Sequence, residues 1–343
     1  RRADVEVPTA GNDRWKWAEK TPQAPEWRKS SGREIQSFID SKAFERVSRK
    51  KMVAEGRRIV KSMMMFKLKG MPSDEFCEEE DFKARFVIAG FQQKPWEYGE
   101  TFAPTPSQAS NRLVTVTALK NGWKTDQLDV KTAFLLSTLS EEHRFVMEPP
   151  PGHEADPDVV WMAISSIYGS KAAPHYWNTD AVKFITTELI DGSPFKRCHF
   201  DPCVFRHRSK RRGRKPGKVD GVLSLHVDDF AVTGEKHIRD EFKAKLAKRW
   251  PIKDLGELNV HLGVVYTWSP DRRSVELSQH AFIDELLSDF NMADCNGCHT
   301  PQEERRLQRA TSPISKEEER FMRNKDYREG VGKVNWLAQT SRP

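Results

Sequence analysis

The sequence has few cysteines, no long apolar run and no signal peptide. Its five cysteines in 343 residues are an odd, sparse set, which argues against a disulfide framework and fits a reducing compartment. No run of about 18 apolar residues occurs, so the sequence predicts no transmembrane helix and no membrane partner. The chain begins at Arg1 rather than Met, and we therefore expect it to be a piece of a longer polypeptide.

The net charge of +7 is concentrated in two basic regions. Residues 206–218 read RHRSKRRGRKPGK, with eight Lys or Arg and no acid, and residues 42–69 hold ten basic residues against two glutamates. Localised positive charge suits contact with a phosphate backbone, so we expect Lys210, Arg211, Arg212 and Arg214 to make such contacts. The same run is equally typical of a solvated loop or a nuclear-localisation segment.

Two adjacent aspartates interrupt an apolar stretch at residues 221–232, GVLSLHVDDFAV. The pattern predicts two short strands joined by a tight turn that carries Asp228 and Asp229. Neighbouring carboxylates in an apolar hairpin repel each other and lose hydration, which favours a bound cation, and their oxygens suit Mg²⁺. For an isolated Asp-Asp pair, an ordinary polar turn is the commoner explanation.

Other periodic patterns predict the elements around this hairpin. Helices are expected at 26–45 and 107–120, and the second carries Leu113, Val116 and Leu119 on one side. Strands at 58–70 and 83–91 should pair as a hairpin arm. The stretch 127–130 reads as the end of a buried strand and carries Asp129. A third carboxylate there could complete a site for two metal ions, although any α/β domain has aspartates at strand ends.

Several motifs also follow one another in a defined order. They are KARFVIAGFQ (83–92), ETFAP (100–104), QLDVKTAFL (127–135), YGSKAAP (168–174) and HVDD (226–229), then DLGE (254–257), Leu262-Gly263, LSQ (277–279), Thr300-Pro301 and YREGVG (327–332). Together they resemble the reverse transcriptase of Ty1/copia-type retrotransposons, which is the polymerase region of a Pol polyprotein. The resemblance extends from about Trp27 to Pro343.

This resemblance implies an α+β fold of the right-hand polymerase type with an antiparallel palm sheet. A tail at 1–25 would precede a reverse transcriptase domain at 26–343. Fingers would occupy about 26–120 and 140–180, the palm about 121–139 and 181–265, and the thumb about 266–343, with a thumb helix at 278–291. The chain ends where a ribonuclease H domain normally begins, so we expect that activity to be absent.

The implied function is RNA-directed DNA synthesis, in which a nucleotidyl group passes from a dNTP to a primer 3′-OH across two Mg²⁺ ions, with Mn²⁺ as a possible substitute. The implied partners are an RNA template, a DNA primer, their RNA–DNA hybrid and dNTPs. The implied location is intracellular, in a cytoplasmic particle or the nucleus, and the oligomeric state is left open.

The resemblance also assigns roles to individual residues. Asp129 and Asp228 would bind both metal ions and Asp229 would complete the acidic cluster. Lys83 and Arg85 would hold the triphosphate, a role that suits a point charge and a fork of donors. Phe134 would be the steric gate against a ribose 2′-OH. Tyr168 and Gly169 would line the nucleotide pocket, with Lys171 beside them. Leu262 and Gly263 would belong to the primer grip.

Some positions depart from the family pattern and keep two other functions open. His226 stands where an aromatic residue is usual, Leu136-Ser137 replaces an Asn-Gly turn, and Ala172 replaces an amide. A catalytically decayed or domesticated nucleic-acid-binding protein is therefore one alternative, and a protein-interaction scaffold that uses residues 206–218 is another. Cys295 and Cys298 have zinc-knuckle spacing, but no second pair lies close in sequence, and ordinary thumb cysteines are the preferred interpretation.

Overall fold

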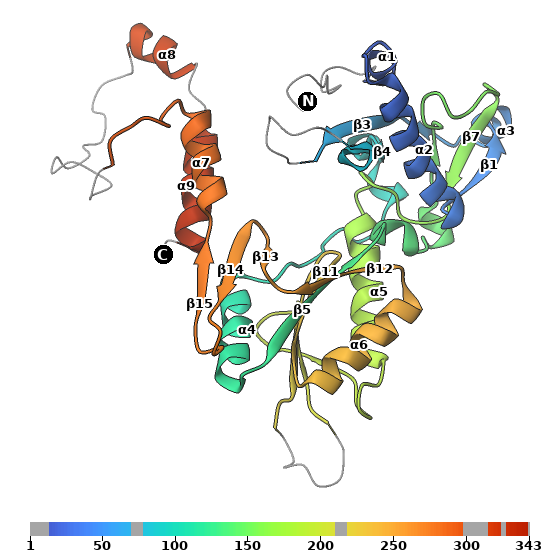
Figure 1. Ribbon diagram of the computed structural model, residues 1–343. Helices are drawn as coiled ribbons and strands as arrows, with labels where there is room; N and C mark the ends of the chain where they lie inside the picture. Colours follow the sequence, from blue (N-terminus) through green and yellow to red (C-terminus); the bar gives the residue numbers. More distant parts are fainter. Residues whose placement is uncertain (1–13, 70–77, 210–217, 298–314, 324–326, 342–343) are drawn as a thin grey trace. The chain divides into compact units, whose positions relative to one another are not determined.

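The fold is described from a computed structural model that places residues 14–69, 78–209, 218–297, 315–323 and 327–341 (Figure 1). Two compact units are present: the first consists of Arg1–Pro106 and Gln127–Leu255, and the second of Ser107–Asp126 and Gly256–Pro343. The boundary between the units falls inside strands β5 (Lys124–Val130) and β12 (Ile252–Glu257).

A helix packed on a two-stranded hairpin forms one part of the first unit. Helix α2 (Ala24–Asp40) follows the short α1 (Arg14–Ala18), and β3 (Ser62–Leu68) pairs antiparallel with β4 (Phe82–Ile88). Trp27 meets Phe82 with ring centroids 4.7 Å apart, and Phe38 meets Phe86 at 5.2 Å. The predicted hairpin arm is therefore confirmed, and the predicted helix is confirmed over residues 26–40. Its last two residues, Phe44 and Glu45, instead begin strand β1.

The strands of a small four-stranded sheet come before and after this hairpin in the sequence. Side chains of the sheet and of the hairpin form one hydrophobic core. Its order is β1 (Phe44–Ser48), β7 (Val159–Ala163), β6 (Val146–Met147) and β2 (Ile59–Val60), with only β2 and β6 parallel. Helix α3 (Arg49–Ala54) follows β1, and the Ser48 hydroxyl caps it by accepting a hydrogen bond from the Lys51 amide. Short 3₁₀ turns occupy 79–81, 90–92, 95–97, 133–136 and 141–143.

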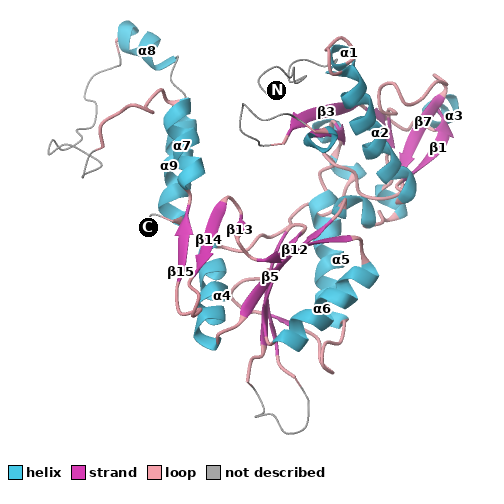
Figure 2. Cartoon of the chain, in the orientation of Figure 1, coloured by secondary structure: helices cyan, strands magenta, loops and turns pink. Residues whose placement is uncertain are grey.

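The main sheet has six strands in the order β12-β5-β11-β10-β9-β8. Its remaining strands are β8 (Lys196–Arg197), β9 (Val204–His207), β10 (Gly221–His226) and β11 (Asp229–Gly234), which pair antiparallel in sequence order. Helices α5 (Ala173–Thr187) and α6 (Lys236–Arg249) lie beside this sheet (Figure 2). They bury Trp177 and Phe242 against its apolar side chains. The predicted hairpin around the two aspartates is confirmed, and the basic run joins β9 to β10.

The second unit contains helix α4 (Gln108–Asn121), a three-stranded sheet and C-terminal helices. The sheet order is β13 (Val260–His261), β14 (Val264–Trp268) and β15 (Val275–Ser278), and the helices are α7 (His280–Asp289), α8 (Lys316–Arg323) and α9 (Tyr327–Thr340). The predicted helix at 278–291 is α7. The Arg112 guanidinium of α4 donates to the last carbonyls of α9, at Gln339 and Thr340, where a helix end leaves such groups open.

The apolar side that the sequence gives to α4 is not the side that the helix buries. Leu113 and Val116 are exposed, whereas Val114, Thr115 and Ala118 are buried. The physical reason is the partner surface: Tyr266 is buried, and the Thr115 side chain hydrogen-bonds its hydroxyl. Spacing alone could not select between two neighbouring stripes of the same helix.

The mixed α+β class with antiparallel sheets is confirmed. Within the described residues, the model contains no helix with the length and apolar character needed to cross a membrane. The division into tail, fingers, palm and thumb stays a prediction. Residues 14–18 of the predicted tail form α1, in which Ala18 is buried and Trp15 stacks on Phe66.

Candidate active site

The acidic turn lies between β10 and β11, where His226 pairs with Asp229 and leaves Val227 and Asp228 as the two turn residues. Val227 has φ +56°, a left-handed conformation that is unfavourable for a β-branched residue. Its carbonyl accepts a 2.7 Å hydrogen bond from the indole Nε1 of Trp177 in α5. The strand pairing of β10 with β11 and the hydrogen bond from α5 therefore hold the strained turn in place.

Asp129 is brought to this turn by the pairing of its own strand. The backbone amide of Val130 donates to the carbonyl of Asp228 at 3.0 Å. Burial, followed by the charges of Asp228 and Asp229, raises the pKa of the Asp129 carboxyl, and burial also raises the pKa of Asp228. The structure therefore brings together Asp129 and Asp228, which lie 99 positions apart in sequence, and their metal-binding role stays a prediction.

Asp229 differs from this pair in its surroundings. Its Oδ2 accepts a 2.8 Å hydrogen bond from the Nε2 amide of Gln127, two residues before Asp129 on β5. This bond fixes the direction of the carboxylate, so Gln127 orients the third member of the cluster.

The carboxylates fit a hard divalent cation by their chemistry. Burial and neighbouring carboxylates raise the pKa of both half-buried aspartates, and a cation would relieve this unfavourable charge; carboxylate oxygens are what Mg²⁺ prefers. No three His, Cys, Asp or Glu side chains in the described ranges are already arranged around one metal position. The fit therefore rests on Asp129 and Asp228.

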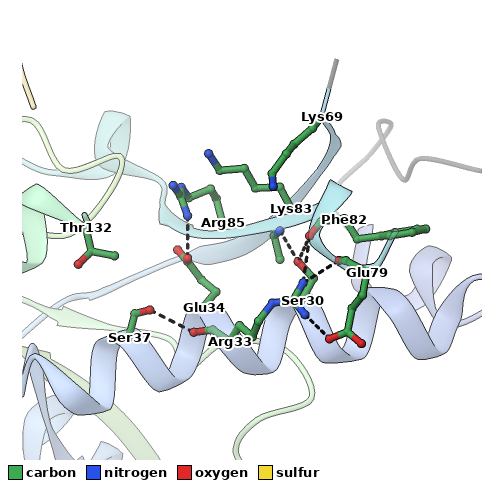
Figure 3. Close-up of a pocket in the computed structure, with 11 residues that line it drawn as sticks. Ser30, Arg33, Glu34, Ser37, Lys69, Glu79, Phe82, Lys83, Arg85 and Thr132 are labelled. Atoms are coloured by element: carbon green, nitrogen blue, oxygen red, sulfur yellow. Dashed lines mark hydrogen bonds and ion pairs between the residues drawn. The ribbon is translucent and has the colours of Figure 1, made fainter. Parts of the chain in front are cut away.

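The β3–β4 hairpin, named the fingers hairpin after the subdomain predicted for it, carries the two predicted phosphate-binding residues, Lys83 and Arg85. Strand alternation sends Lys83 and Arg85 of β4 to the same side, and both line a pocket of about 670 Å³ between β4 and α2 (Figure 3). Partial burial, followed by the charge of Arg85, lowers the pKa of Lys83. Thr132, from the turn after Asp129, lines the same pocket, so the cations and the strand carrying Asp129 border one space.

The ring of Tyr168 contacts both Arg85 and Phe134. The Arg85 guanidinium carbon lies 5.2 Å from the centroid of the Tyr168 ring, and that ring lies 5.3 Å from the ring of Phe134. Burial raises the pKa of Tyr168 to about 12, which keeps its hydroxyl protonated at neutral pH. The predicted nucleotide-pocket residue and the predicted steric gate thus share one aromatic contact.

Gly169 permits a close backbone approach beside Tyr168. Its φ of +87° is left-handed, and a Cβ there would lie 2.4 Å from the carbonyl oxygen of Ile88. A Cβ on Gly90 would lie 1.9 Å from the carbonyl oxygen of Gly169. The turn at 168–169 and the end of β4 therefore touch through bare backbone.

Other predicted site residues lie in different surroundings. Lys171 donates from Nζ to the Tyr98 hydroxyl at 3.1 Å and to the Gln93 carbonyl at 3.4 Å, so it contacts the loop after the fingers hairpin. Leu262 and Gly263 form the β13–β14 turn of the second unit, with φ +53° and +74°. The four predicted backbone-contacting residues, Lys210, Arg211, Arg212 and Arg214, lie outside the described residues, as does Cys298.

Comparison with known families decides the identity. The profile of the family described as Reverse transcriptase (RNA-dependent DNA polymerase) matches residues 50–304. The chain belongs to this family.

Individual relatives of this reverse transcriptase chain confirm the predicted Ty1/copia-type resemblance. The Retrovirus-related Pol polyprotein from transposon TNT 1-94 of Nicotiana tabacum is 30% identical over 327 residues, which is 94% of this chain and 23% of that protein. The corresponding polyprotein from transposon RE2 of Arabidopsis thaliana is 31% identical over 269 residues, or 76% and 17%. The chain therefore spans less than a quarter of either relative. Putative transposon Ty5-1 protein YCL074W of Saccharomyces cerevisiae is 30% identical over 220 residues, or 63% and 65%.

Two solved structures are similar at low identity. The foamy viral protease-reverse transcriptase in complex with dsDNA matches with a TM-score of 0.44 and 13% identity, over 90% of this chain and 47% of that one. The dRH form of the same viral protein matches with a TM-score of 0.42 and 11% identity, over 91% and 40%.

Three supporting residues of this reverse transcriptase domain were not found by sequence reasoning. Gln127 and Trp177 carry no sequence signal, because their bonds to Asp229 and Val227 join strands and helices far apart in the chain. Glu34 did carry one. It lies on the apolar stripe of α2 with Trp27, Ile35 and Phe38, and a charged residue on a core-facing stripe indicates a buried partner.

Proposed function

We propose that the chain is the RNA-directed DNA polymerase of a copia-type retroelement. In the proposed reaction the primer 3′-oxygen forms a bond to the α-phosphorus of a dNTP, the bond from that phosphorus to the β-phosphate oxygen breaks, and pyrophosphate leaves with its electron pair. The hydroxyl proton is released to water. The observation that carries the proposal is that Asp129 of β5 lies beside Asp228 of the β10–β11 turn, in a chain of the reverse transcriptase family.

Asp129 and Asp228 are the residues that would hold Mg²⁺ or Mn²⁺, with Asp229 kept in direction by Gln127. When bound, such ions neutralise phosphate charge and increase the nucleophilicity of a hydroxyl oxygen. The predicted number of two ions belongs to this proposal. The raised pKa of both carboxyls supports it, because the pair gains most from a cation where the two charges are close and poorly hydrated.

The other side chains would bind and select the nucleotide. Arg85 and Lys83 present a planar fork of donors and a point charge on one side of β4, which suits a triphosphate. Phe134 is held against the ring of Tyr168 and would crowd a ribose 2′-OH. Positioning of the two reactants and charge neutralisation would supply most of the rate, since phosphoryl transfer needs little covalent chemistry from the protein.

The proposed partners are an RNA template, a DNA primer, their hybrid and dNTPs, and the proposed location is a cytoplasmic particle or the nucleus. Basic residues 206–218 would add backbone contacts and make binding salt-dependent. A second candidate is a nucleic-acid-binding protein that has lost synthesis. The departures at His226, Leu136-Ser137 and Ala172 are the observations that favour it.

Primer extension on an RNA template separates the two candidates. The wild-type chain, Asp228→Asn and the control Asp240→Asn are compared with dNTPs and Mg²⁺ or Mn²⁺. Asp240 is exposed on α6 and pairs with Lys236, so the control makes the same chemical change away from the turn. We expect extension by wild type and control, and loss of at least about a hundredfold in Asp228→Asn. Folded wild-type protein that binds hybrid without extending it would instead establish the binding function.

A further inference from the structure

The outer edge of β4 is covered in an unusual way. β3 and β4 form a two-stranded sheet, so β4 has one edge without a strand partner among the described elements. Along that edge the amides of Ala84, Phe86 and Ile88 donate to three different groups: the Ser30 hydroxyl at 2.8 Å, Glu34 Oε1 at 3.1 Å and the Tyr168 carbonyl at 2.9 Å. The backbone amide of every second residue from Ala84 to Ile88 therefore donates a hydrogen bond to a group outside the two-stranded sheet.

The spacing of α2 makes this possible. Four helical residues rise about 6 Å and two strand residues rise about 6.7 Å, so side chains at i and i+4 can reach alternate amides of a neighbouring strand. Ser30 and Glu34 have this spacing. Ser30 also donates to the Phe82 carbonyl at 2.7 Å, so it serves the strand edge alone. For Ser30, edge closure accounts for all of its described contacts.

Glu34 does more than close the edge. A serine, threonine or glutamine would suffice for the Phe86 amide, yet a carboxylate is buried here with 4% of its side chain exposed. Its second oxygen, Oε2, accepts a 2.9 Å hydrogen bond from Arg85 Nη1, as Figure 3 shows. Burial raises the pKa of Glu34, so the ionised form is held at a cost and the opposing guanidinium offsets it.

The same guanidinium lies over the Tyr168 ring, and its charge lowers the proton affinity of Asp228. Arg85 keeps 37% of its side chain exposed, so it is held at one face and open to the pocket at the other. A long flexible side chain fixed in this way loses less freedom when it binds an anion.

We infer that Glu34 is a positioning residue, which holds the Arg85 guanidinium over Tyr168 so that its open face is preset for the dNTP triphosphate. This inference rests on the proposed polymerase function. It assigns to α2 a role in nucleotide affinity that is separate from its packing on the hairpin.

Steady-state primer extension with a dNTP titration tests the inference. Glu34→Gln keeps the side-chain volume and an oxygen for Phe86, but it places an amide NH₂ against Arg85. We expect the KM for dNTP to rise about tenfold, because the charge-assisted hydrogen bond between Glu34 and Arg85 is lost. We expect kcat to stay within about threefold, because Arg85 would bind the nucleotide equally in the ground state and the transition state. Ser30→Ala is the matched control: it removes edge bonds of β4 without touching Arg85. It should lower the unfolding temperature and leave the KM unchanged.

Two results would overturn the inference while leaving the polymerase in place: an unchanged KM in Glu34→Gln, or an equal rise in Ser30→Ala. If Glu34→Gln does not fold, Glu34→Asp replaces it. The shorter carboxylate keeps its charge but cannot reach both partners, so a rise of about threefold is expected and no rise refutes the role. A wild-type chain without extension removes the proposed function itself, and this inference with it.

Discussion

Substitution of Gly169 by alanine tests the contact between the 168–169 turn and the fingers hairpin. The added Cβ would lie 2.4 Å from the Ile88 carbonyl oxygen and 3.2 Å from its nitrogen, which real Cβ atoms do not tolerate. The turn cannot simply move away, because the Ile88 amide is bonded to the Tyr168 carbonyl at 2.9 Å. Gly192→Ala is the matched control: its φ of +81° is nearly the same, but nothing lies within 4 Å of the new Cβ.

The control measures the backbone effect alone. A left-handed alanine destabilises the folded state by about 1–2 kcal/mol, and the lower conformational entropy of the unfolded chain offsets about 0.4–1 kcal/mol of this loss. Gly169→Ala adds overpacking of about 1–3 kcal/mol and strain on one hydrogen bond worth about 1 kcal/mol. We therefore expect a loss of about 1 kcal/mol for Gly192→Ala and of at least about 3 kcal/mol for Gly169→Ala.

Urea denaturation followed by tryptophan fluorescence measures both variants against wild type. The difference between the two variants, rather than either value alone, reports the contact. Equal destabilisation would refute the close approach of Ile88 and Gly169. A second check is primer extension, which should fall in Gly169→Ala at temperatures where the protein remains folded, because the turn also places Tyr168 against Arg85.

Two further predictions address α4 and the cysteines. Val114→Ala should destabilise the chain by about 1–3 kcal/mol and Leu113→Ala by less than about 0.5 kcal/mol in the same assay. The reverse order would show that α4 buries the side that carries Leu113. Burial raises the pKa of the Cys203 thiol to about 11, and that thiol donates to the Pro104 carbonyl. The folded state therefore retains this proton, and its stability should fall as pH rises from the unfolded thiol value of about 8.5 toward 11. Iodoacetamide at pH 8.5 should accordingly label exposed Cys295 well before Cys203 in the native protein, as peptide mass mapping would show.

The sequence was informative where local pattern and chemistry coincide. The acidic hairpin at 221–234 was predictable because alternation breaks at Asp228 and Asp229, and the fingers hairpin because two apolar strands flank an acidic loop. Asp129 was placed correctly beside Asp228 only through the motif resemblance, since nothing in a single sequence measures a contact across 99 residues. Family motifs and the structure thus agree on where the carboxylates meet.

The remaining contacts depend on tertiary packing that no periodicity records. Thr115 rather than Leu113 faces inward because Tyr266 offers a hydroxyl across the unit, and Lys171 turns toward Tyr98 because the loop after the hairpin returns to α5. Glu34 was detectable as a charge on an apolar stripe, but its partner was not. Sequence pattern identifies which residues are unusual, whereas the fold alone determines what they touch.

The way α2 closes the edge of β4 has a practical consequence for protein engineering. An isolated β3–β4 hairpin would expose the amides of Ala84 and Phe86 as an open strand edge, which invites pairing with another chain. The smallest portable fingers module therefore begins at Ala24, with α2 included, rather than at Ser62. Chimeras that exchange the hairpin between relatives should exchange the helix with it, because Ser30 and Glu34 fix the position of the strand along its length.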